Sequence, residues 1–397
     1  MKILDLKIEG FRSLKSVHWQ PGDVNVLIGP NAGGKSNLLQ ALEMIAESSK
    51  GKLAEFVKKQ GGMQSIVWNG KVDVIKFGIE TPHTHQEAIN RKDYSILYQF
   101  NIERLGKTSS CTLQKEYFYS IVPDSPRTDT PPIFCRNNIE GANKINTYDI
   151  QAFETNLKEN ETALSDAEIV FREEAWIHKY RRHLSSWKIH SYFNTGPNST
   201  IRQPIVASYE TQVNPDGENL CSVIHSLYEE NRDFHDEINS GIKAAFPDFE
   251  KLSFVSAGGD GRIQLSIWWK SLDKPQSAAN LSDGTLRFLY LLTILADPEP
   301  PSLIAIDEPE AGLHPRMLPI IAEYALEASR RTQVVLATHS PEMLSAFGKR
   351  QTEVTVTVAE WEEGQTKLKT LEGDKLDYWL KEYTLGELFR SGELEDM

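Results

Sequence analysis

The chain has 397 residues, of which 40% are hydrophobic and 25% are charged. This length and balance are sufficient for a sizeable hydrophobic core in one large or two smaller domains, and they exclude a disordered protein. A net charge of -13 argues against a general polyanion binder, although a local basic face is compatible with it.

The N-terminal sequence and the cysteines indicate the cellular compartment of the protein. Residues 1–9 alternate apolar and charged side chains, which is typical of a half-exposed strand and not of a secretion signal. The longest strongly apolar run, 288–296, is far shorter than the ~20 residues that cross a bilayer. Cys111, Cys135 and Cys221 are widely spaced and form no C-x-x-C pair, so we expect buried thiols and no zinc or disulfide framework. These features predict a cytoplasmic protein without a membrane segment.

A strand, a glycine-rich turn and a helix are predicted in succession near the N-terminus. The apolar run 24–28 leads into Gly29-Pro30-Asn31-Ala32-Gly33-Gly34-Lys35-Ser36, of pattern G-x-x-x-x-G-K-S, and Asn37 opens a helical period. Such a turn curls so that backbone N–H groups converge, and the positive end of the helix completes a phosphate cradle. We expect Lys35 to reach the β- and γ-phosphates of ATP, and the Ser36 hydroxyl to bind Mg²⁺. Arg12 either reaches the same nucleotide or is a solvated turn residue.

The middle of the chain predicts structure more than function. Alternating runs at 72–77, 94–100 and 116–121 predict an antiparallel sheet. The proline-rich 122–132 is expected to be a loop, and the Asn-rich 136–165 to be the least structured part. Helices are expected over 166–187 and 218–245, and a hairpin over 252–269. The sequence shows no heptad run, which excludes a long coiled-coil arm.

Two adjacent carboxylates end a buried strand within 301–309. Asp307 is placed to hold Mg²⁺, and Glu308 to polarise a water in line with the γ-phosphate. A second apolar strand, 332–338, ends on His339, which we expect to hydrogen-bond the γ-phosphate because α/β sheets bind ligands at this edge. A helix start for the two acids and a structural role for the histidine are the alternatives.

A second phosphate-binding helix start is predicted at Ser282-Asp283-Gly284-Thr285, before the apolar helix 288–295. The Ser282 side chain and the Gly284 backbone would open that helix at its positive end. One nucleotide needs only one such cradle. We therefore expect the second to cap the γ-phosphate held by another copy of the chain, and an N-cap on a core helix is the alternative.

The chain resembles an ABC-type ATPase head of the RecF, SMC and OLD kind, in a compact branch often called AAA-type. The motifs that carry this resemblance are, in chain order, the P-loop, L-S-D-G-T, I-D-E-P-E-A-G-L-H-P and A-T-H-S-P-E. The opening I-E-G-F-R-S-L and the closing T-L-G-E-L-F-R-S-G-E-L-E are similar to the ends of that branch. The resemblance implies a two-lobed α/β fold, with a mixed sheet around the P-loop, an antiparallel β lobe and a helical insertion. We expect one head over 1–397, with an N-terminal lobe (1–135), an insertion (136–275) and a C-terminal lobe (276–397).

The resemblance also implies roles for single residues. It makes 29–36 the Walker A loop, 282–285 the signature, Asp307 and Glu308 the Walker B pair and His339 the switch histidine, with Lys35, Glu308 and His339 catalytic. It places a D-loop at a dimer seam, formed by Ala311, Gly312, Leu313 and His314. The chain departs from the pattern because its signature is LSDGT where transporters have LSGGQ, and because no coiled coil or Toprim nuclease module is present. No Q-loop glutamine is assigned, and Gln64 and Gln203 are candidates.

These expectations describe an ATPase that binds MgATP and closes head to tail with a second copy, or within a larger assembly. By family analogy, the cycle serves DNA repair or antiphage defence by controlling a separate effector, such as a nuclease or toxin. A rival is a RecF-like clamp that binds DNA directly, supported only by the basic helix around Arg181 and Arg182, which could equally be a solvated face. A small-molecule P-loop kinase explains neither the signature nor His339, and a transporter subunit would need a coupling glutamine.

Overall fold

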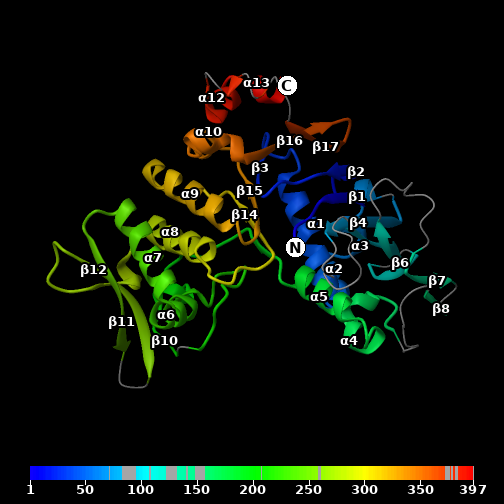
Figure 1. The fold of residues 1–397 in the computed structure, drawn as a ribbon, viewed down its shortest axis with the longest axis horizontal. Coiled ribbons are helices and arrows are strands. Elements are labelled where there is room, and N and C mark those ends of the chain that lie inside the picture. The colour runs from blue at the N-terminus through cyan, green and yellow to red at the C-terminus, as the bar shows by residue number, and fades with distance from the viewer. Residues whose placement is uncertain are drawn as a thin grey trace, which may run out of the picture. The chain divides into compact units, whose positions relative to one another are not determined.

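The computed structural model describes the chain except for residues 71, 83–94, 107–108, 122–131, 140–141, 148–156, 207, 258–260, 372–375, 377–378, 381–382 and 397. The described residues form two compact units (Figure 1). Unit 1 comprises Met1–Gly22, Ile28–Trp187 and Val356–Thr370, and unit 2 comprises Asp23–Leu27, Lys188–Thr355 and Leu371–Met397. Residues 136–187 therefore lie with the N-terminal part of the chain, and 188–275 lie with the C-terminal part.

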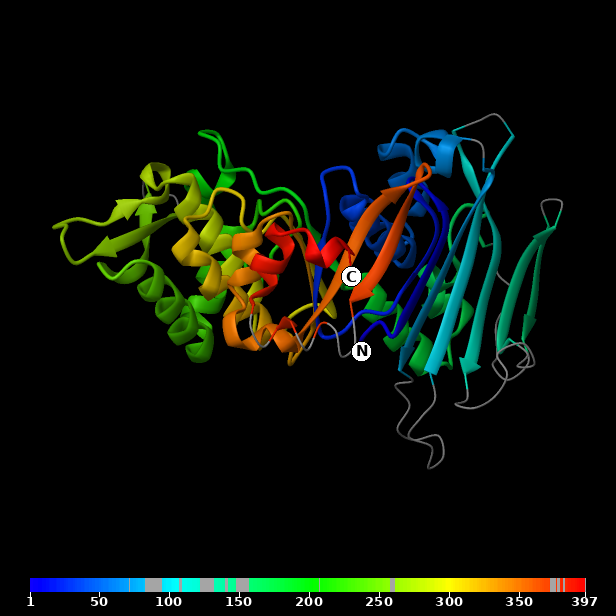
Figure 2. The same ribbon diagram turned by 90° about the horizontal axis from the view of Figure 1, so that it is seen from above.

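Unit 1 is built on a seven-stranded antiparallel sheet of order β2-β1-β4-β5-β6-β7-β8. Its long central strands run side by side, in cyan, in Figure 2. The prediction of an antiparallel sheet is confirmed. The expectation that 136–165 is the least structured part is wrong for the residues described in this range, because β7 and β8 pair there as a hairpin. The strands are β1 Asp5–Phe11, β2 Leu14–Trp19, β4 Val74–Pro82, β5 Ser95–Arg104, β6 Cys111–Ile121, β7 Phe134–Ile139 and β8 Ala142–Thr147.

Helices cover one face of this sheet through an aromatic core. Tyr180 of α5 meets Tyr98 and Phe118 edge-on, at centroid distances of 5.9 and 5.8 Å. Edge-to-face rings at this spacing pack favourably, so these contacts fix α5 on β5 and β6. The unit also holds residues 356–370, which make up most of two neighbouring strands, β16 (Val354–Glu362) and β17 (Gln365–Leu371). Its helices are α1 Lys35–Ser49, α2 Leu53–Lys59, α3 Met63–Ile66, η1 Trp68–Gly70, η2 Ala163–Asp166, α4 Ala167–Val170 and α5 Ala175–Ser185.

Unit 2 is built on parallel strands in the order β3 (Val24–Ile28), β15 (Gln333–Ala337), β14 (Leu303–Asp307) and β9 (Lys188–His190). All of β3 except Ile28 belongs to this unit. The strands β3 and β15 are buried along their whole length, which explains their continuous apolar sequences. The strands predicted within 301–309 and 332–338 are confirmed.

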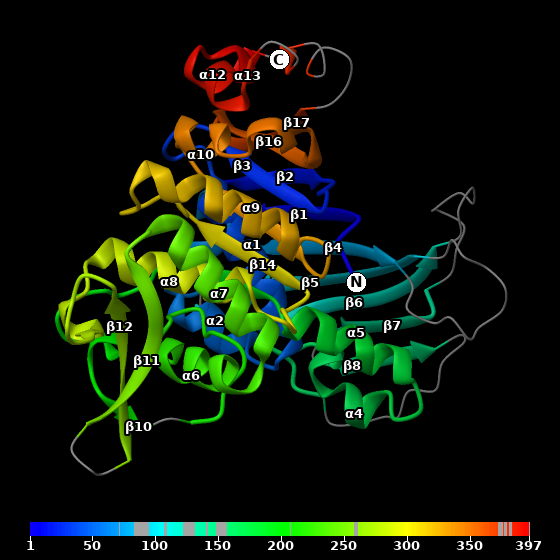
Figure 3. The ribbon, with the colours of Figure 1, turned by 60° about the vertical axis from the view of Figure 1, so that its left-hand side comes forward.

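Helices and a smaller sheet complete unit 2 (Figure 3). The helix expected over 218–245 is two helices, because Asn231 leaves the helical conformation and caps α7 by accepting from Phe234 N at 2.9 Å. The predicted hairpin is confirmed as β11 and β12, with β10 beside β12. These elements are β10 Ile205–Val206, β11 Phe249–Ala257, β12 Arg262–Trp269, β13 Gln276–Ser277, η3 Thr200–Arg202, α6 Leu220–Glu230, α7 Arg232–Ala245, η4 Ala278–Asn280, α8 Asp283–Leu295, η5 Pro315–Met317, α9 Leu318–Ala328, α10 Pro341–Ser345, η6 Gly348–Glu353, α12 Leu385–Arg390 and α13 Glu393–Asp396.

The structure tests the predictions that the cysteines are buried and that the chain has no membrane segment. The three cysteines are free thiols and are all buried, as predicted. Burial raises the pKa of Cys111 and of Cys221 to about 11, so neither is a reactive thiolate at neutral pH. Within the described residues, no helix combines the length and the apolar character that a membrane span requires.

Candidate functional site: a P-loop and a Walker B edge

The predicted phosphate loop connects β3 to α1. Its lysine is almost buried, and Lys35 Nζ donates to the carbonyl oxygens of Gly29 at 2.7 Å and of Pro30 at 3.0 Å. The residue before α1 is Gly34, which has no side chain to cap the helix, and the first turn carries no acidic residue. An anion at this end would therefore meet a positive helix terminus and no competing carboxylate.

The hairpin of β16 and β17 packs directly against this loop. A Cβ added at Gly29 or at Gly33 would lie 2.2 or 2.4 Å from the carbonyl oxygen of Ala359, and one at Gly34 would lie 2.0 Å from Thr366 Oγ1. Gly34 also has a φ of 106°, which an L side chain rarely adopts. Glycine is therefore required at these positions for two reasons: the phosphate loop curls there, and the neighbouring strands leave no room for a side chain.

A short hydrogen-bond chain ties the loop helix to this hairpin. Asn37 Nδ2 donates to Ser13 Oγ at 2.6 Å, and Ser13 Oγ lies 2.6 Å from Thr366 Oγ1. The sequence did not predict the roles of the Ser13 and Thr366 hydroxyl groups. Thr366 lies 329 positions after Asn37 in the chain, and no local sequence pattern relates the two residues. Arg12, the other residue predicted here, has a φ of 48° and donates from Nη2 to Gln60 Oε1 at 2.7 Å, while its buried Nε has no partner.

The parallel strands of unit 2 bring the starts of three motifs to one edge. Leu27 of β3 is in register with Ala337 of β15, which is in register with Asp307 of β14. The P-loop begins two residues after Leu27, Glu308 directly follows Asp307, and His339 lies two residues after Ala337. This is the carboxyl edge, at which parallel sheets bind their ligands.

Glu308 has an unusual backbone. Its φ is 49°, in the left-handed region, and its N–H donates to the carbonyl oxygen of Ala337 at 2.8 Å. A non-glycine residue in this region costs on the order of 1–3 kcal/mol and persists where the surrounding structure imposes it. Such strain is frequent at functional sites, and here it fixes where the half-exposed carboxylate points.

His339 lies between two carboxylates. Its Nδ1 is 3.5 Å from Glu308 Oε1 and 3.7 Å from Glu310 Oε1. Glu310 accepts from Thr338 Oγ1 at 2.6 Å, and its other oxygen, Oε2, is buried without a partner. Sequence reasoning placed His339 and Glu308 but missed Glu310, although its position two residues after Glu308 was a readable signal. The arrangement orients the imidazole by its Nδ1 side.

The predicted signature caps α8 and contacts the predicted D-loop. Ser282 is the N-cap, and its Oγ accepts from Thr285 N at 3.1 Å. A Cβ on Gly284 would lie 2.7 Å from the carbonyl oxygen of Gly312, so the start of α8 packs closely on the 311–314 turn. Arg287 Nη2 donates to the carbonyl oxygen of Glu308 at 3.2 Å. The start of α8 and the segment that begins at Glu308, predicted as signature and Walker B glutamate, are therefore in contact within unit 2.

Residues 24–345, which include most of the chain and all of these motifs, match the model of the family described as "AAA domain, putative AbiEii toxin, Type IV TA system". The chain belongs to this family. Its fold is similar to the SMC head bound to the C-winged helix domain of ScpA, with a TM-score of 0.57 and 11% identity over 95% of this chain and 100% of that chain. It is also similar to the Smc head domain with an extended coiled coil bound to the C-terminal domain of ScpA derived from Pyrococcus furiosus, with a TM-score of 0.53 and 11% identity over 96% and 99%.

A local sequence match links this AAA-family chain to a DNA repair protein. A stretch of 70 residues is 36% identical to the DNA replication and repair protein RecF of Moorella thermoacetica. The match spans only 17% of this chain and 17% of that protein. The SMC head folds confirm the predicted mixed α/β fold. The family match over 24–345, with this local match beside it, agrees with the predicted resemblance to ABC-type ATPase heads of the RecF and SMC kind.

The residues of this AAA-family chain suit ATP and Mg²⁺ in a specific way. In the described parts of the chain, no group of three or more His, Cys, Asp or Glu side chains is placed to hold a metal ion alone. Nucleotide-bound Mg²⁺ needs no such group, because one hydroxyl, one carboxylate and the phosphates share its coordination. The two residues predicted for it from the sequence, Ser36 and Asp307, are a hydroxyl and a carboxylate. The phosphate loop carries no acid in the first turn of its helix, which fits a polyphosphate anion.

Proposed function

We propose that the chain binds MgATP at 29–36 and hydrolyses it in a head-to-tail homodimer, in which residues 282–285 of one copy cap the γ-phosphate held by the other. The observation that carries this proposal is the second prepared helix start. Two of the described helices, α1 and α8, begin at predicted phosphate-binding motifs, whereas one triphosphate occupies only one cradle. In a dimer, the start of α8 in one copy would bind the γ-phosphate that the P-loop of the other copy holds.

Each residue of the proposed site has a distinct task. Lys35 is held over the loop by two carbonyl oxygens and would exchange them for the β- and γ-phosphates. Mg²⁺, when bound by Ser36 and Asp307, supplies charge neutralisation to the phosphates. Glu308 orients and polarises the attacking water, and His339 contacts the γ-phosphate through its Nε2 side, because Nδ1 faces carboxylates. Most of the rate enhancement is positioning and electrostatics.

The substitution Glu308→Gln tests this proposal. It keeps the shape of the side chain but removes the base, so steady-state ATP hydrolysis should fall by a factor on the order of 10² to 10⁴. ATP-bound dimer should accumulate, and size-exclusion chromatography with light scattering would measure it. The exposed Glu323→Gln on α9 is the matched control and should leave both readouts unchanged. A Glu308→Gln protein that stays monomeric and hydrolyses ATP at the parent rate would overturn the proposal.

We further propose that the ATP cycle controls a separate cytoplasmic effector, such as a nuclease or toxin, in antiphage defence or DNA repair. The family description, which names a toxin of a toxin–antitoxin system, and the two SMC heads, which are bound to ScpA, support a partner protein. Co-expression with the products of adjacent genes tests this idea, with effector activity compared between the parent and Glu308→Gln. Effector activity that is identical in both would contradict it.

Direct DNA binding is the second candidate, and the local likeness to RecF favours it. The basic helix is a weak basis, because Arg181 donates to Ser49 O at 3.3 Å and pairs with Glu168 at 3.2 Å, and Tyr180 and His183 are buried. Arg182 remains exposed on that helix. ATPase assays with and without duplex DNA separate the candidates, since a clamp should respond to DNA in a salt-dependent manner.

A further inference from the structure

Arg202 makes a set of contacts that no sequence motif predicts. It ends η3, and its side chain is only 11% exposed. Its Nη1 donates to three carbonyl oxygens of the segment that leads into α8, those of Ala278 at 3.1 Å, Ala279 at 3.0 Å and Leu281 at 2.8 Å. A guanidinium here gives the carbonyl oxygens at the end of η4 a side-chain donor and shapes the turn before the signature.

The other nitrogens of Arg202 fix the guanidinium from both sides. Its Nη2 donates to Asp283 Oδ1 at 2.6 Å, and its Nε donates to the carbonyl oxygen of Thr195 at 2.7 Å. Its own carbonyl oxygen accepts from Gln264 Nε2 of β12 at 3.0 Å. All three guanidinium nitrogens are thus engaged, so the side chain is held in one orientation.

Asp283 explains why this cation matters. It is the first residue of α8 and occupies the position at which LSGGQ has a glycine. A carboxylate at a helix N-terminus stabilises the free helix, but it repels a triphosphate that approaches the same terminus. Because the Asp283 side chain is 73% exposed, its charge is open to such a ligand unless a cation compensates it.

We propose that Arg202 is a positioning residue of the signature: it shapes the turn 278–283 and neutralises Asp283, so that the N-terminus of α8 accepts the γ-phosphate held by a second copy. This inference rests on the proposed function, since it concerns the half of the site that acts on the other copy. The Arg202–Asp283 pair would explain how an LSDGT signature can act in place of LSGGQ. The negative charge of Asp283 stays at the helix start, and the positive charge of Arg202 compensates it.

The test uses the full-length chain in the Glu308→Gln background, in which ATP-bound dimer accumulates. Two quantities are measured: the affinity of the monomer for a fluorescent ATP analogue, and the ATP concentration at which half of the protein is dimeric. Arg202→Gln should raise the second at least tenfold and change the first less than twofold, because the P-loop belongs to unit 1. Arg330→Gln, which removes an exposed arginine paired with Glu327, is the control and should change neither.

A rescue experiment separates charge compensation from a purely structural role. Adding Asp283→Asn to Arg202→Gln removes the uncompensated carboxylate, so dimer formation should recover in part, while the share of the loss that comes from the shape of the turn 278–283 remains. Arg202→Lys keeps the charge but not the planar fork, so it should lie between parent and Arg202→Gln. If Asp283→Asn brings no recovery although thermal melting shows a folded chain, the compensation is refuted.

Each failure points to a different proposal. If Glu308→Gln alone does not dimerise with ATP, the proposed function is wrong. If it dimerises and Arg202→Gln dimerises at the same ATP concentration, only the inference about Arg202 is wrong. If Arg202→Gln does not fold, Arg202→Lys decides the question, because dimerisation that matches the parent at both low and high salt would overturn a role for the guanidinium.

Discussion

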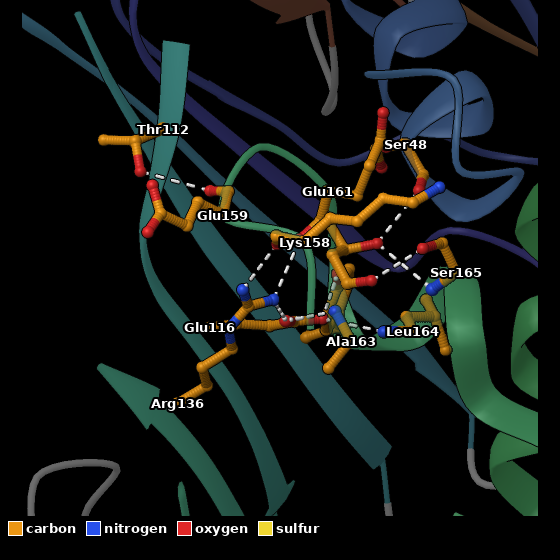
Figure 4. A network of polar contacts seen from close by, with 12 residues as sticks. Ser48, Thr112, Glu116, Arg136, Lys158, Glu159, Glu161, Ala163, Leu164 and Ser165 are labelled. Carbon is orange, nitrogen blue, oxygen red and sulfur yellow. Dashed lines mark hydrogen bonds and ion pairs between the residues drawn. The ribbon is translucent and has the colours of Figure 1, made fainter. Parts of the chain in front are cut away.

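A buried ion pair in unit 1 allows a quantitative test of how this unit supports the phosphate loop. Arg136 is 1% exposed and donates to the carbonyl oxygens of Glu161 at 2.8 Å and Lys158 at 2.7 Å (Figure 4). It lies 3.9 Å from Glu116, which is fully buried. The same network reaches α1, because Thr162 Oγ1 donates to the carbonyl oxygen of Ser48 at 2.9 Å.

The perturbation is Arg136→Met, which keeps much of the aliphatic volume and removes the charge. Two charge-assisted hydrogen bonds are lost, each contributing about 1.5–3 kcal/mol. Glu116 keeps its acceptor bonds from Ala163 N at 2.7 Å, Leu164 N at 3.1 Å and the Tyr98 hydroxyl at 2.9 Å, but its charge is no longer compensated. Removing one partner of such a pair costs about 3–5 kcal/mol, so this is the expected loss in the unfolding free energy of unit 1.

Urea unfolding followed by tryptophan fluorescence measures this loss. Adding Glu116→Gln should recover part of it, because burial already raises the pKa of Glu116 and the neutral amide removes the uncompensated charge. The exposed pair of Lys76 and Glu9 gives the control, since Lys76→Gln should cost less than about 1 kcal/mol. A loss below about 1 kcal/mol for Arg136→Met would show that the network does not stabilise the unit.

Two further predictions concern acid stability and the phosphate loop. Burial lowers the pKa of His190 to about 3, so the folded chain keeps this ring neutral while the unfolded chain protonates it below pH 6.5. Stability should therefore fall by up to about 1.4 kcal/mol per pH unit from pH 6.5 towards 3, and His190→Phe should flatten this slope in denaturation midpoints measured at pH 7, 6 and 5. An unchanged slope would contradict it. Thr366→Val removes the hydroxyl that bonds Ser13, and should weaken ATP binding about two- to tenfold in calorimetry with the fold retained; parent affinity would refute the link.

The sequence was sufficient where the determinant is local. Alternation and apolar runs predicted the antiparallel strands and the parallel strands that end at Asp307 and before His339, because burial on one or both faces dictates these patterns. The helix start at Ser282 was also predicted from local sequence, because a serine hydroxyl at this position bonds a backbone N–H of the first turn. The sequence did not predict contacts between residues that lie far apart along the chain. Arg202 meets the signature across 81 positions, and Thr366 meets Ser13 across 353.

The loop glycines show what such remote partners add to a motif. Read from sequence, Gly29, Gly33 and Gly34 serve only the curl of a phosphate cradle. In the fold, the one carbonyl oxygen of Ala359 lies against both Gly29 and Gly33, and Thr366 lies against Gly34. A Cβ at any of these positions would clash with one of these two strands. The shape of the cradle is therefore set by the β16–β17 hairpin, and a displacement of that hairpin would change nucleotide binding without altering any residue of the P-loop.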